Sequence, residues 1–468
     1  MSLLRQKPRP ARTKPAPAVT SPAAELAPSP PVDDRPGVDV LRLSHEGRGV
    51  ARSPEGKTLF ITGALPQERV TYRVTKQHAR YDEAQLETLV HASPDRVTPA
   101  CVHAETCGGC PLQHLAPSAQ QQQKQQQLAS LLLPLMPVPL APAPMLSAEP
   151  WGYRRRARLG VKWRRDGRLL LGFREAGSSH LAEIHQCLVL EPELNALLTP
   201  LYQLIPQLVG GKHLGHLELL ATPDGRALLV RLLRPLVRLA SQDRQLWQDF
   251  ARQHQLVLLL DDGEQRETLL ASQPLHLPLI GPRGPLQLEL TPGAFVQVNA
   301  AINQAMLDQA LQWLNLQGTE RVLDLFCGFG NLTLPLAQQA AQVLGVEVVP
   351  AQVAQAQRNA ERHQLTQASF VCADLSRPFA DQPFMQMAWD VLVLDPPRAG
   401  AQAVIEQLPA LPKIPRILYI SCHPVTLARD VALLQQQGYQ IERWGAMDMF
   451  PQTAHSEAMV LLSAARPS

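Results

Sequence analysis

The stretch Val322-Leu323-Asp324-Leu325-Phe326-Cys327-Gly328-Phe329-Gly330-Asn331 joins an apolar run to a turn that contains two glycines. Glycine permits a tight turn and a close approach of the backbone to a ligand. Further short apolar runs follow, with helical stretches between them, at residues 343–347, 370–373, 391–394 and 417–422. This alternation predicts a parallel β-sheet with helices on both faces, an α/β fold, over residues 296–468.

Acidic residues stand where the predicted strands end. Glu347 ends the second strand, where a carboxylate can accept both ribose hydroxyls of a nucleoside cofactor, and Asp374 follows the third. A dinucleotide needs a pyrophosphate seat, yet Thr333 occupies the third glycine position of the turn. S-adenosylmethionine has no phosphate and carries a positive sulfonium, so it fits better. Either acid taken alone could equally be an ordinary polar residue at a strand end.

A thiol and a carboxylate are the predicted reacting groups. Cys422 ends the fifth strand in Ser421-Cys422-His423-Pro424, and Glu457 closes the segment 448–457. A thiolate can attack C6 of a pyrimidine and make C5 nucleophilic, after which a base must remove the C5 proton. We predict Cys422 as the nucleophile and Glu457 as the base, although a strand-end cysteine is more often a packing residue. Cys327 and Cys372 are interpreted as packing residues.

Asp395-Pro396-Pro397-Arg398 ends the fourth strand, at the sheet edge where ligands bind. Similar tetrads orient an exocyclic nitrogen in amino-group methyltransferases, so the motif alone leaves the target atom open. Cytosine-C5 methylation is a further alternative. RNA enzymes of that type carry a catalytic cysteine in this fourth-strand motif, and none is present here, so uracil is preferred.

A second group of cysteines predicts a metal centre. Cys101, Cys107 and Cys110 form C-x5-C-x2-C, and Cys187 is the best candidate for a fourth ligand. Zinc held by four thiolates is the competing assignment. Structural zinc sites usually show two short cysteine pairs, so the spacing favours a [4Fe-4S] cluster in a reducing compartment.

The length of 468 residues predicts about three domains. Residues 1–36 are rich in Pro and Ala and are expected to form a disordered tail. Residues 37–92 have short alternating runs, which predict a small β-barrel. The many arginines of this barrel either bind RNA or merely solvate its outer face. Residues 93–295 form a central mixed α+β region. It contains the cysteine loop, a helical glutamine run (120–127), a proline-rich linker, and arginines interleaved with aromatics from residue 151, which favour RNA binding over a merely solvated hairpin.

Two further bounds follow from composition. The net charge of +3 is too mild to indicate a polyanion partner by itself. Prolines interrupt the apolar stretch 128–146, and no leader pattern is present, so we expect a cytoplasmic protein without a membrane partner.

From about residue 38 onward the chain resembles the bacterial RNA uracil-C5 methyltransferases. The resemblance lies in the order of the motifs above, together with residues 295–299, DLFCGFGN, DPPR, SCHP and DMFPQTAHSE. The resemblance implies an OB-like TRAM barrel and a Rossmann-like class I S-adenosylmethionine-dependent domain. It implies a [4Fe-4S] cluster on Cys101, Cys107, Cys110 and Cys187, with Cys422 as nucleophile and Glu457 as base. It also implies a cofactor and uracil site formed by Gln297, Phe326, Asn331, Glu347, Asp374 and Asp395.

Within that family the tRNA branch lacks both the TRAM domain and the cluster, and one rRNA branch has the cluster alone. A chain with both the TRAM domain and the cluster resembles the branch that methylates C5 of a specific uridine in 23S rRNA to give 5-methyluridine. The resemblance implies that this uridine is unpaired or flipped and that the reaction passes through a covalent Cys-C6 adduct. The alternatives are a tRNA uracil-C5 methyltransferase and an RNA-binding iron-sulfur protein with a non-catalytic domain. No protein partner is expected. His423 and Phe329 depart from the family pattern of asparagine and methionine.

Overall fold

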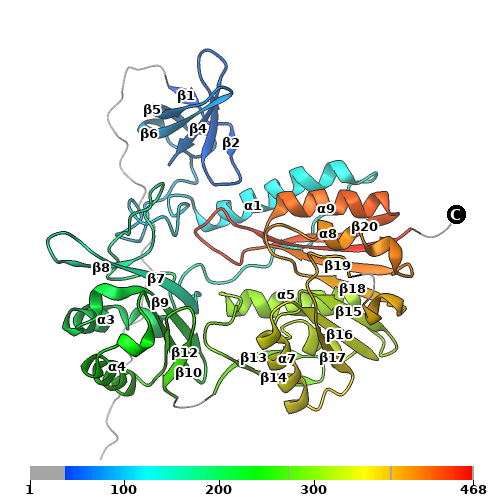
Figure 1. Cartoon of the computed structure of the whole chain (residues 1–468). Coiled ribbons are helices and arrows are strands. Elements are labelled where there is room, and N and C mark those ends of the chain that lie inside the picture. The colour runs from blue at the N-terminus through cyan, green and yellow to red at the C-terminus, as the bar shows by residue number, and fades with distance from the viewer. Residues whose placement is uncertain (1–36, 272–273, 380–381, 466–468) are drawn as a thin grey trace, which may run out of the picture.

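The computed structural model describes residues 37–271, 274–379 and 382–465, and the tail expected over residues 1–36 lies outside this part of the chain. Within it, backbone pairing forms a six-stranded N-terminal sheet, a six-stranded central sheet, a two-stranded hairpin and a seven-stranded C-terminal sheet. Figure 1 shows the N-terminal strands as a separate lobe, with the central and C-terminal sheets side by side beneath it.

The N-terminal lobe has the sheet order β1-β5-β6-β4-β3-β2. Its strands are β1 (Val38–Asp39), β2 (Arg42–Leu43), β3 (Gly49–Arg52), β4 (Thr58–Thr62), β5 (Arg69–Gln77) and β6 (Tyr81–His91). Alternate residues of β4, among them Leu59 and Ile61, point into a small apolar core with Ala51 and Val70. The strand-rich lobe predicted from alternating runs is therefore present.

The central sheet has the order β12-β11-β10-β9-β7-β8. Its strands are β7 (Arg156–Trp163), β8 (Leu169–Gly172), β9 (Leu214–Thr222), β10 (Gly225–Leu232), β11 (Leu256–Asp261) and β12 (Arg266–Leu270). Only β10 and β11 run parallel, joined by helix α4 (Ser241–Gln253), whose Trp247 is fully buried against the sheet. Short helices α2 (Pro192–Asn195) and α3 (Leu198–Leu204) complete this layer.

The hairpin of β13 (Leu275–Gly281) and β14 (Gly284–Leu290) connects the central sheet to the C-terminal one. Its inward leucines, such as Leu277 and Leu288, share an apolar core with Ile302 and Leu307 of the following helix. The same core also contains Leu220, Leu229 and Leu259 of the central sheet, so the hairpin packs against both bodies.

The C-terminal sheet has the order β17-β16-β15-β18-β19-β21-β20. Its strands are β15 (Arg321–Leu325), β16 (Gln342–Glu347), β17 (Ala368–Cys372), β18 (Val391–Leu394), β19 (Arg416–Ser421), β20 (Tyr439–Met447) and β21 (Glu457–Ala464). The first five are parallel, as predicted, whereas β21 is antiparallel to both neighbours. Its helices are α5 (Ala300–Leu314), α6 (Thr333–Ala337), α7 (Pro350–Arg362), α8 (Gln402–Ile405) and α9 (Pro424–Gln436).

Both faces of this sheet are covered. In β18, Val391 and Val393 belong to one apolar core, and Leu392 and Leu394 belong to the core on the other face. This explains why these strands read as continuous apolar runs. The strand order reverses between β15 and β18, and ligands bind at the carboxyl ends of strands beside such a reversal.

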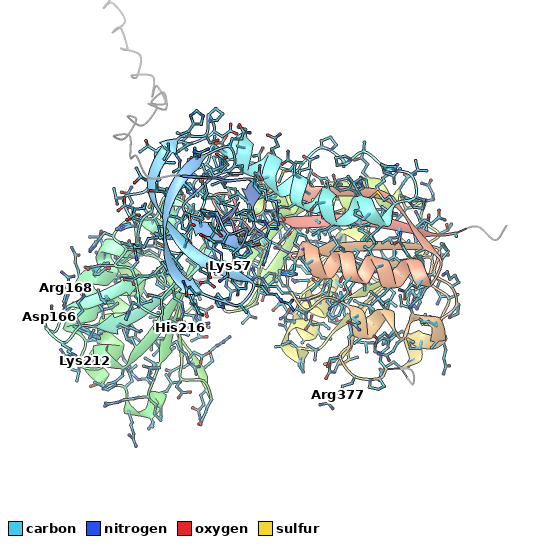
Figure 2. The ribbon with its side chains drawn as sticks, turned by 90° about the horizontal axis from the view of Figure 1, so that it is seen from above. Lys57, Asp166, Arg168, Lys212, His216 and Arg377 are labelled. Carbon is cyan, nitrogen blue, oxygen red and sulfur yellow. The ribbon has the colours of Figure 1, made fainter. Side chains whose placement is uncertain are left out.

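The glutamine-rich segment forms helix α1 (Pro117–Leu132), as predicted. Figures 1 and 2 show α1 lying beside α9 on one face of the C-terminal sheet, where Leu128 and Leu132 are fully buried. Helix α1 therefore belongs structurally to the C-terminal body, although the cysteine loop precedes it directly.

The proline-rich linker also covers an edge strand. The amides of Ala143 and Leu146 donate to the carbonyls of Trp444 (2.8 Å) and Ala446 (3.1 Å) in β20, and the amide of Asp448 donates back to Leu146 (2.8 Å). Unpaired backbone groups on a sheet edge would otherwise remain open to pairing with another chain. Among the helices of the described residues, none has the length and apolar character needed to cross a bilayer.

Candidate active site and cysteine cluster

A pocket of about 680 Å³ lies at the carboxyl ends of the parallel strands, within the size range of small-molecule sites. Its walls come from the glycine turn, the ends of β16 to β19 and the start of β21. The lining includes both predicted reacting residues and most of the predicted cofactor residues: Cys422, Glu457, Gln297, Phe326, Glu347, Asp374 and Asp395.

Cys422 and Glu457 face each other because of strand register. The last paired residues of antiparallel β19 and β21 are Ser421 and Ala458. One further step along each strand places Cys422 opposite Glu457 at the open end of the ladder, and Glu457 is also paired with Met447 of β20. The thiol and the carboxyl group thus come from adjacent strands.

Burial dominates the electrostatics of this pair. It raises the pKa of Glu457 to about 8, with a further contribution from Asp395, whose own pKa is raised to about 7 by burial. Burial also raises the pKa of Cys422, the charges of Glu457 and Asp395 add to this, and Arg398 opposes it. At neutral pH the free site therefore holds a thiol and a mostly protonated Glu457.

His423, which departs from the family pattern, begins helix α9 as its N-cap. Its Nδ1 accepts a hydrogen bond from the amide of Thr426 (3.3 Å). Asparagine is among the preferred N-cap residues, so histidine performs here the capping that asparagine would perform. Burial and the nearby Arg398 lower the pKa of His423, and the imidazole is mostly neutral beside the thiol at neutral pH.

The glycine turn is held against Glu347. The amide of Gly328 donates to Glu347 Oε2 (3.2 Å), and the amides of Val348 and Val349 donate to Oε1 (2.9 and 3.0 Å). Phe326, at the start of the turn, has a φ of 68°, which is uncommon for a bulky residue and typical of binding-site backbone. The turn and the end of β16 thus form one rigid wall of the pocket.

Two predicted cofactor residues differ in their placement. Asp374 lines the pocket and accepts hydrogen bonds from the amide (3.0 Å) and hydroxyl (2.6 Å) of Ser376, which lower its pKa. Asn331 is not part of the lining. Its side-chain amide instead exchanges hydrogen bonds with Asn303 of α5 (3.0 and 2.9 Å), which fixes the turn against that helix.

The sequence reasoning did not identify the apolar part of the pocket. Phe295 and Val348 line it while 60% and 53% exposed, and Phe450 and Leu375 complete the apolar surface. Large exposed apolar side chains at a pocket mouth suit stacking on an unpaired base. Phe295 stands two positions before Gln297, and this adjacency was the only available signal.

The basic stretch after residue 151 divides into buried and open parts. Tyr153 and Arg155 are buried. The Tyr153 hydroxyl donates to the carbonyl of Pro451 (3.1 Å), and Arg155 Nε donates to the carbonyl of Gln297 (2.7 Å). These two residues therefore support the pocket backbone and are not exposed to RNA.

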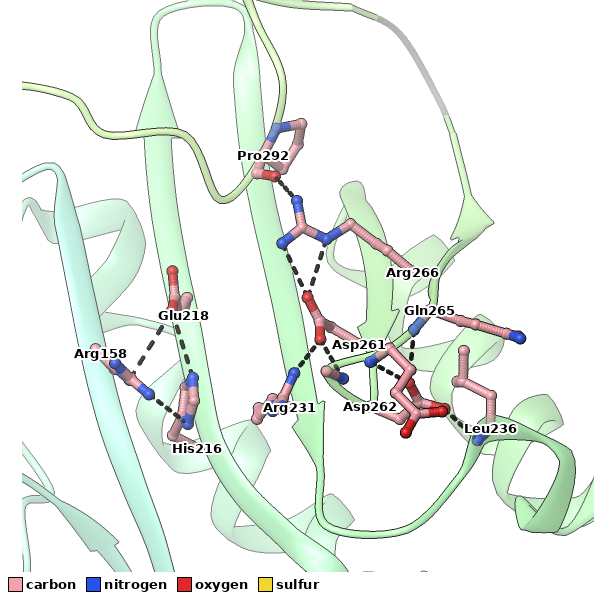
Figure 3. A network of polar contacts seen from close by, with 12 residues as sticks. Arg158, His216, Glu218, Arg231, Leu236, Asp261, Asp262, Gln265, Arg266 and Pro292 are labelled. Atoms are coloured by element: carbon pink, nitrogen blue, oxygen red, sulfur yellow. Dashed lines mark hydrogen bonds and ion pairs between the residues drawn. The ribbon is translucent and has the colours of Figure 1, made fainter. Parts of the chain in front are cut away.

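Other members of the stretch line an open groove of about 390 Å³ on the central sheet, with Arg158, Lys162, Phe173, Arg174 and His216 among its walls. Figure 3 shows that Arg158 and His216 also lie against Glu218, with N–O distances of 3.9 and 3.4 Å. Figure 2 shows His216, Lys212 and Arg168 on the part of the molecule that contains the central sheet. The groove keeps a basic and aromatic surface despite the partial pairing.

The four predicted cluster cysteines line one small pocket, together with Phe173, Ile184 and Val189. No set of three His, Cys, Asp or Glu in the described ranges is placed to hold a single metal ion. These observations are compatible, since a cubane cluster separates its thiolates more widely than one ion does. Burial raises the pKa of Cys110 to about 12, and it raises the pKa values of Cys107 and Cys187 as well.

The remaining cysteines differ from each other. Cys327 is buried, as expected for a packing residue. Cys372 is exposed, so its interpretation as a packing residue is wrong, because β17 is the edge strand of the sheet.

The chain matches known proteins over most of its length. A family model described as tRNA (Uracil-5-)-methyltransferase matches residues 117–465, and a TRAM domain model matches residues 37–86. A protein of Shewanella amazonensis is 44% identical over 424 residues, which cover 90% of this chain and 94% of that protein. One of Chromohalobacter salexigens is 42% identical over 436 residues, covering 92% and 90%. Both are named 23S rRNA (uracil(1939)-C(5))-methyltransferase RlmD.

A solved structure shares the fold. The tRNA (uracil-54, C5)-methyltransferase of Pyrococcus abyssi, in complex with S-adenosyl-L-homocysteine, is 20% identical with a TM-score of 0.69, covering 91% of this chain and 100% of that one. Together with the family model over most of the chain, these matches show that the protein is a member of the RNA uracil-C5 methyltransferase family that carries an N-terminal TRAM domain.

Proposed function

We propose that this protein transfers a methyl group from S-adenosylmethionine to C5 of one uridine in 23S rRNA. The observation that carries the proposal is the placement of Cys422 opposite Glu457 in a pocket at the carboxyl edge of the sheet. The naming of relatives at 42–44% identity as 23S rRNA enzymes supports the choice of RNA.

The residues of the pocket suit the cofactor. S-adenosylmethionine supplies an electrophilic methyl group on a sulfonium sulfur. Glu347 is placed to accept ribose hydroxyls, and Asp374 lies at the end of the third strand where an adenine edge can be met. The glycine turn leaves room for close approach, and buried Asp395 adds a further carboxyl group to the pocket lining.

The reaction is assigned to the facing pair. The thiolate of Cys422 adds to C6 of uracil, and the electrons of the C5–C6 double bond move toward the O4 carbonyl. C5 then bonds to the methyl carbon as the carbon–sulfur bond of the sulfonium breaks and S-adenosylhomocysteine leaves. Glu457 next removes the C5 proton while the bond between C6 and the cysteine sulfur breaks. Electrons return to form the C5–C6 double bond, and the thiolate is released. The raised pKa of Glu457 suits a base that must hold a proton at near-neutral pH.

A [4Fe-4S] cluster is proposed for the four-cysteine pocket. The donor set consists of thiols from Cys101, Cys107, Cys110 and Cys187, and apolar side chains shield them. The amide of Gly109 donates to Cys107 Sγ (3.4 Å), the kind of hydrogen bond that tunes such clusters. The positive core of a cluster would offset part of the charge of four thiolates that burial otherwise disfavours.

The target uridine must be unpaired or leave its stack to reach this pocket, which costs a few kcal/mol. The basic groove on the central sheet and the arginines of the N-terminal lobe are assigned the phosphate contacts of the RNA. Mass mapping of 5-methyluridine in RNA from cells with and without the gene tests the proposal. Loss of one 5-methyluridine from 23S rRNA is expected; loss from tRNA alone, or from neither RNA, contradicts it.

A further inference from the structure

The carboxyl group of Glu457 is held mainly through its backbone. Its side chain is 4% exposed, and Oε2 has no hydrogen-bond partner within the part of the chain that the structure describes. Glu457 is the first residue of β21 and pairs with Met447, the last residue of β20, so the segment 448–456 that joins the two strands leads directly into it. Contacts to this segment therefore act on the backbone path that ends at the carboxyl-bearing residue.

Helix α1 holds the segment through Gln120. Gln120 Nε2 donates to Gln452 Oε1 (2.9 Å), and the amide of Gln452 donates to Gln120 Oε1 (2.9 Å). Gln120 Nε2 also donates to the carbonyls of Leu112 (3.0 Å) and Leu115 (2.8 Å), and the amide of Leu112 donates to Gln452 (3.0 Å). Gln452 has a φ of 69°, a conformation that a glutamine adopts only when its surroundings impose it.

One helical turn later, Lys124 makes the second attachment. Lys124 Nζ donates to Asp448 Oδ1 (2.6 Å) and to the carbonyl of Phe450 (3.0 Å). Lys124 is 2% exposed and Asp448 3%, so this ion pair is removed from water. Positions 120 and 124 share one face of the helix, which therefore contacts the first half of the segment, from Asp448 to Gln452.

These contacts are better suited to fixing geometry than to adding stability. Desolvation of two buried charges consumes much of their attraction, and well-packed apolar residues often replace such pairs without loss. A polar network whose members are all satisfied does, however, specify a single arrangement. Here the network specifies the path of the segment that leads into Glu457.

We propose that Gln120 and Lys124 are positioning residues for Glu457 and that they act on the proton-removal step. This inference rests on the proposed function, in which Glu457 is the base. Cys422 directly follows β19, which pairs with β18 and β21, and it lies outside the segment 448–456 that Gln120 and Lys124 bind, so we expect its attack on uracil to be unaffected by loss of those contacts. Loss of the α1 contacts should slow release of the product while leaving formation of the protein-RNA adduct almost unchanged.

The test uses the full-length protein with S-adenosylmethionine and an RNA oligonucleotide that contains the mapped uridine. In a single turnover, the ratio of covalent protein-RNA adduct to released 5-methyluridine is measured for Gln120→Leu and for Lys124→Met combined with Asp448→Asn. The second change avoids leaving Asp448 as an unpaired buried charge. Gln126→Ala, an exposed position on the same helix, is the matched control.

Because only folded molecules react, a loss of folded protein lowers adduct and product together and leaves their ratio unchanged. We expect the ratio to rise roughly tenfold or more in both variants and to stay at the wild-type value in the control, since small displacements of a reacting group slow reactions strongly. A wild-type ratio in either variant overturns the inference. Cys422→Ala is measured in parallel, so that failure of the positioning role can be told apart from failure of the proposed function. Turnover in Cys422→Ala overturns the proposed function itself.

Discussion

Cys422 at the end of β19 lies opposite Glu457 at the start of β21, one step beyond the last paired residues of two antiparallel strands. The 34 residues between them in the sequence contain α9, β20 and the segment that α1 holds. The antiparallel insertion of β21 between β19 and β20 is thus what brings the base to the nucleophile.

Turnover should rise with pH across the neutral range. Burial and Asp395 raise the pKa of Glu457 to about 8, and burial raises the pKa of Cys422, so both required ionised forms become more populated as pH increases. We expect the turnover rate to increase up to about tenfold per pH unit between pH 6 and pH 8 while one group limits the rate. A rate independent of pH over this interval would contradict these assignments.

Removing the charge at position 457 should stabilise the fold at alkaline pH. The carboxyl group has a pKa of about 8 when folded against an ordinary value of 4.5. Between these values the folded state binds more protons than the unfolded state, so the free energy of unfolding falls as pH rises. Glu457→Gln removes this loss and should raise Tm by on the order of a few °C at pH 8, and hardly at all near pH 4.

The control for this measurement is Glu442→Gln, which changes an exposed carboxyl group on β20. Its Tm should follow the wild type at both pH values. Equal Tm values for Glu457→Gln and the wild type at pH 8 would show that burial of the ionised carboxyl group does not destabilise the folded state.

Protein purified without oxygen should contain about four iron and about four sulfide per chain, as a [4Fe-4S] cluster requires. Cys110→Ser and Cys187→Ser remove ligands from the enclosed pocket and should lose the iron. Cys372→Ser changes an exposed cysteine on the edge strand and should keep it. Stoichiometric zinc without sulfide would reject the cluster.

The groove on the central sheet should contribute to RNA affinity through phosphate contacts. Replacing Lys162 or Arg174 by alanine should weaken RNA binding severalfold and reduce the slope of log K against log salt by nearly one per residue. Turnover at saturating RNA should change little, because neither residue lines the active-site pocket. If RNA binding by these variants keeps the salt dependence of the wild type, the RNA phosphates do not contact this groove.

The sequence predicted the four inner parallel strands well because each is a short apolar run bounded by turn residues and covered on both faces. The predicted run 391–394 coincides with β18, and the run 417–422 is shifted by one residue from β19. It also placed most of the pocket residues, since strand ends on one edge of a parallel sheet converge.

What the sequence did not predict depends on contacts between distant segments. Asn331 looks like a pocket residue until Asn303 of α5 is seen to bind its side chain. The linker prolines gave no indication that residues 143–146 pair with β20. The partners of Lys124, and Gln452 as partner of Gln120, lie more than 300 positions away, and no local pattern marks them.

The most direct test of the covalent mechanism is denaturing electrophoresis of Glu457→Gln after incubation with S-adenosylmethionine and the target RNA. The account predicts a stable protein-RNA band whose mass includes the transferred methyl group, and no such band for Cys422→Ala. Normal turnover by Cys422→Ala, or an adduct that persists in that variant, would contradict the central claim that this sulfur bonds to the uracil ring.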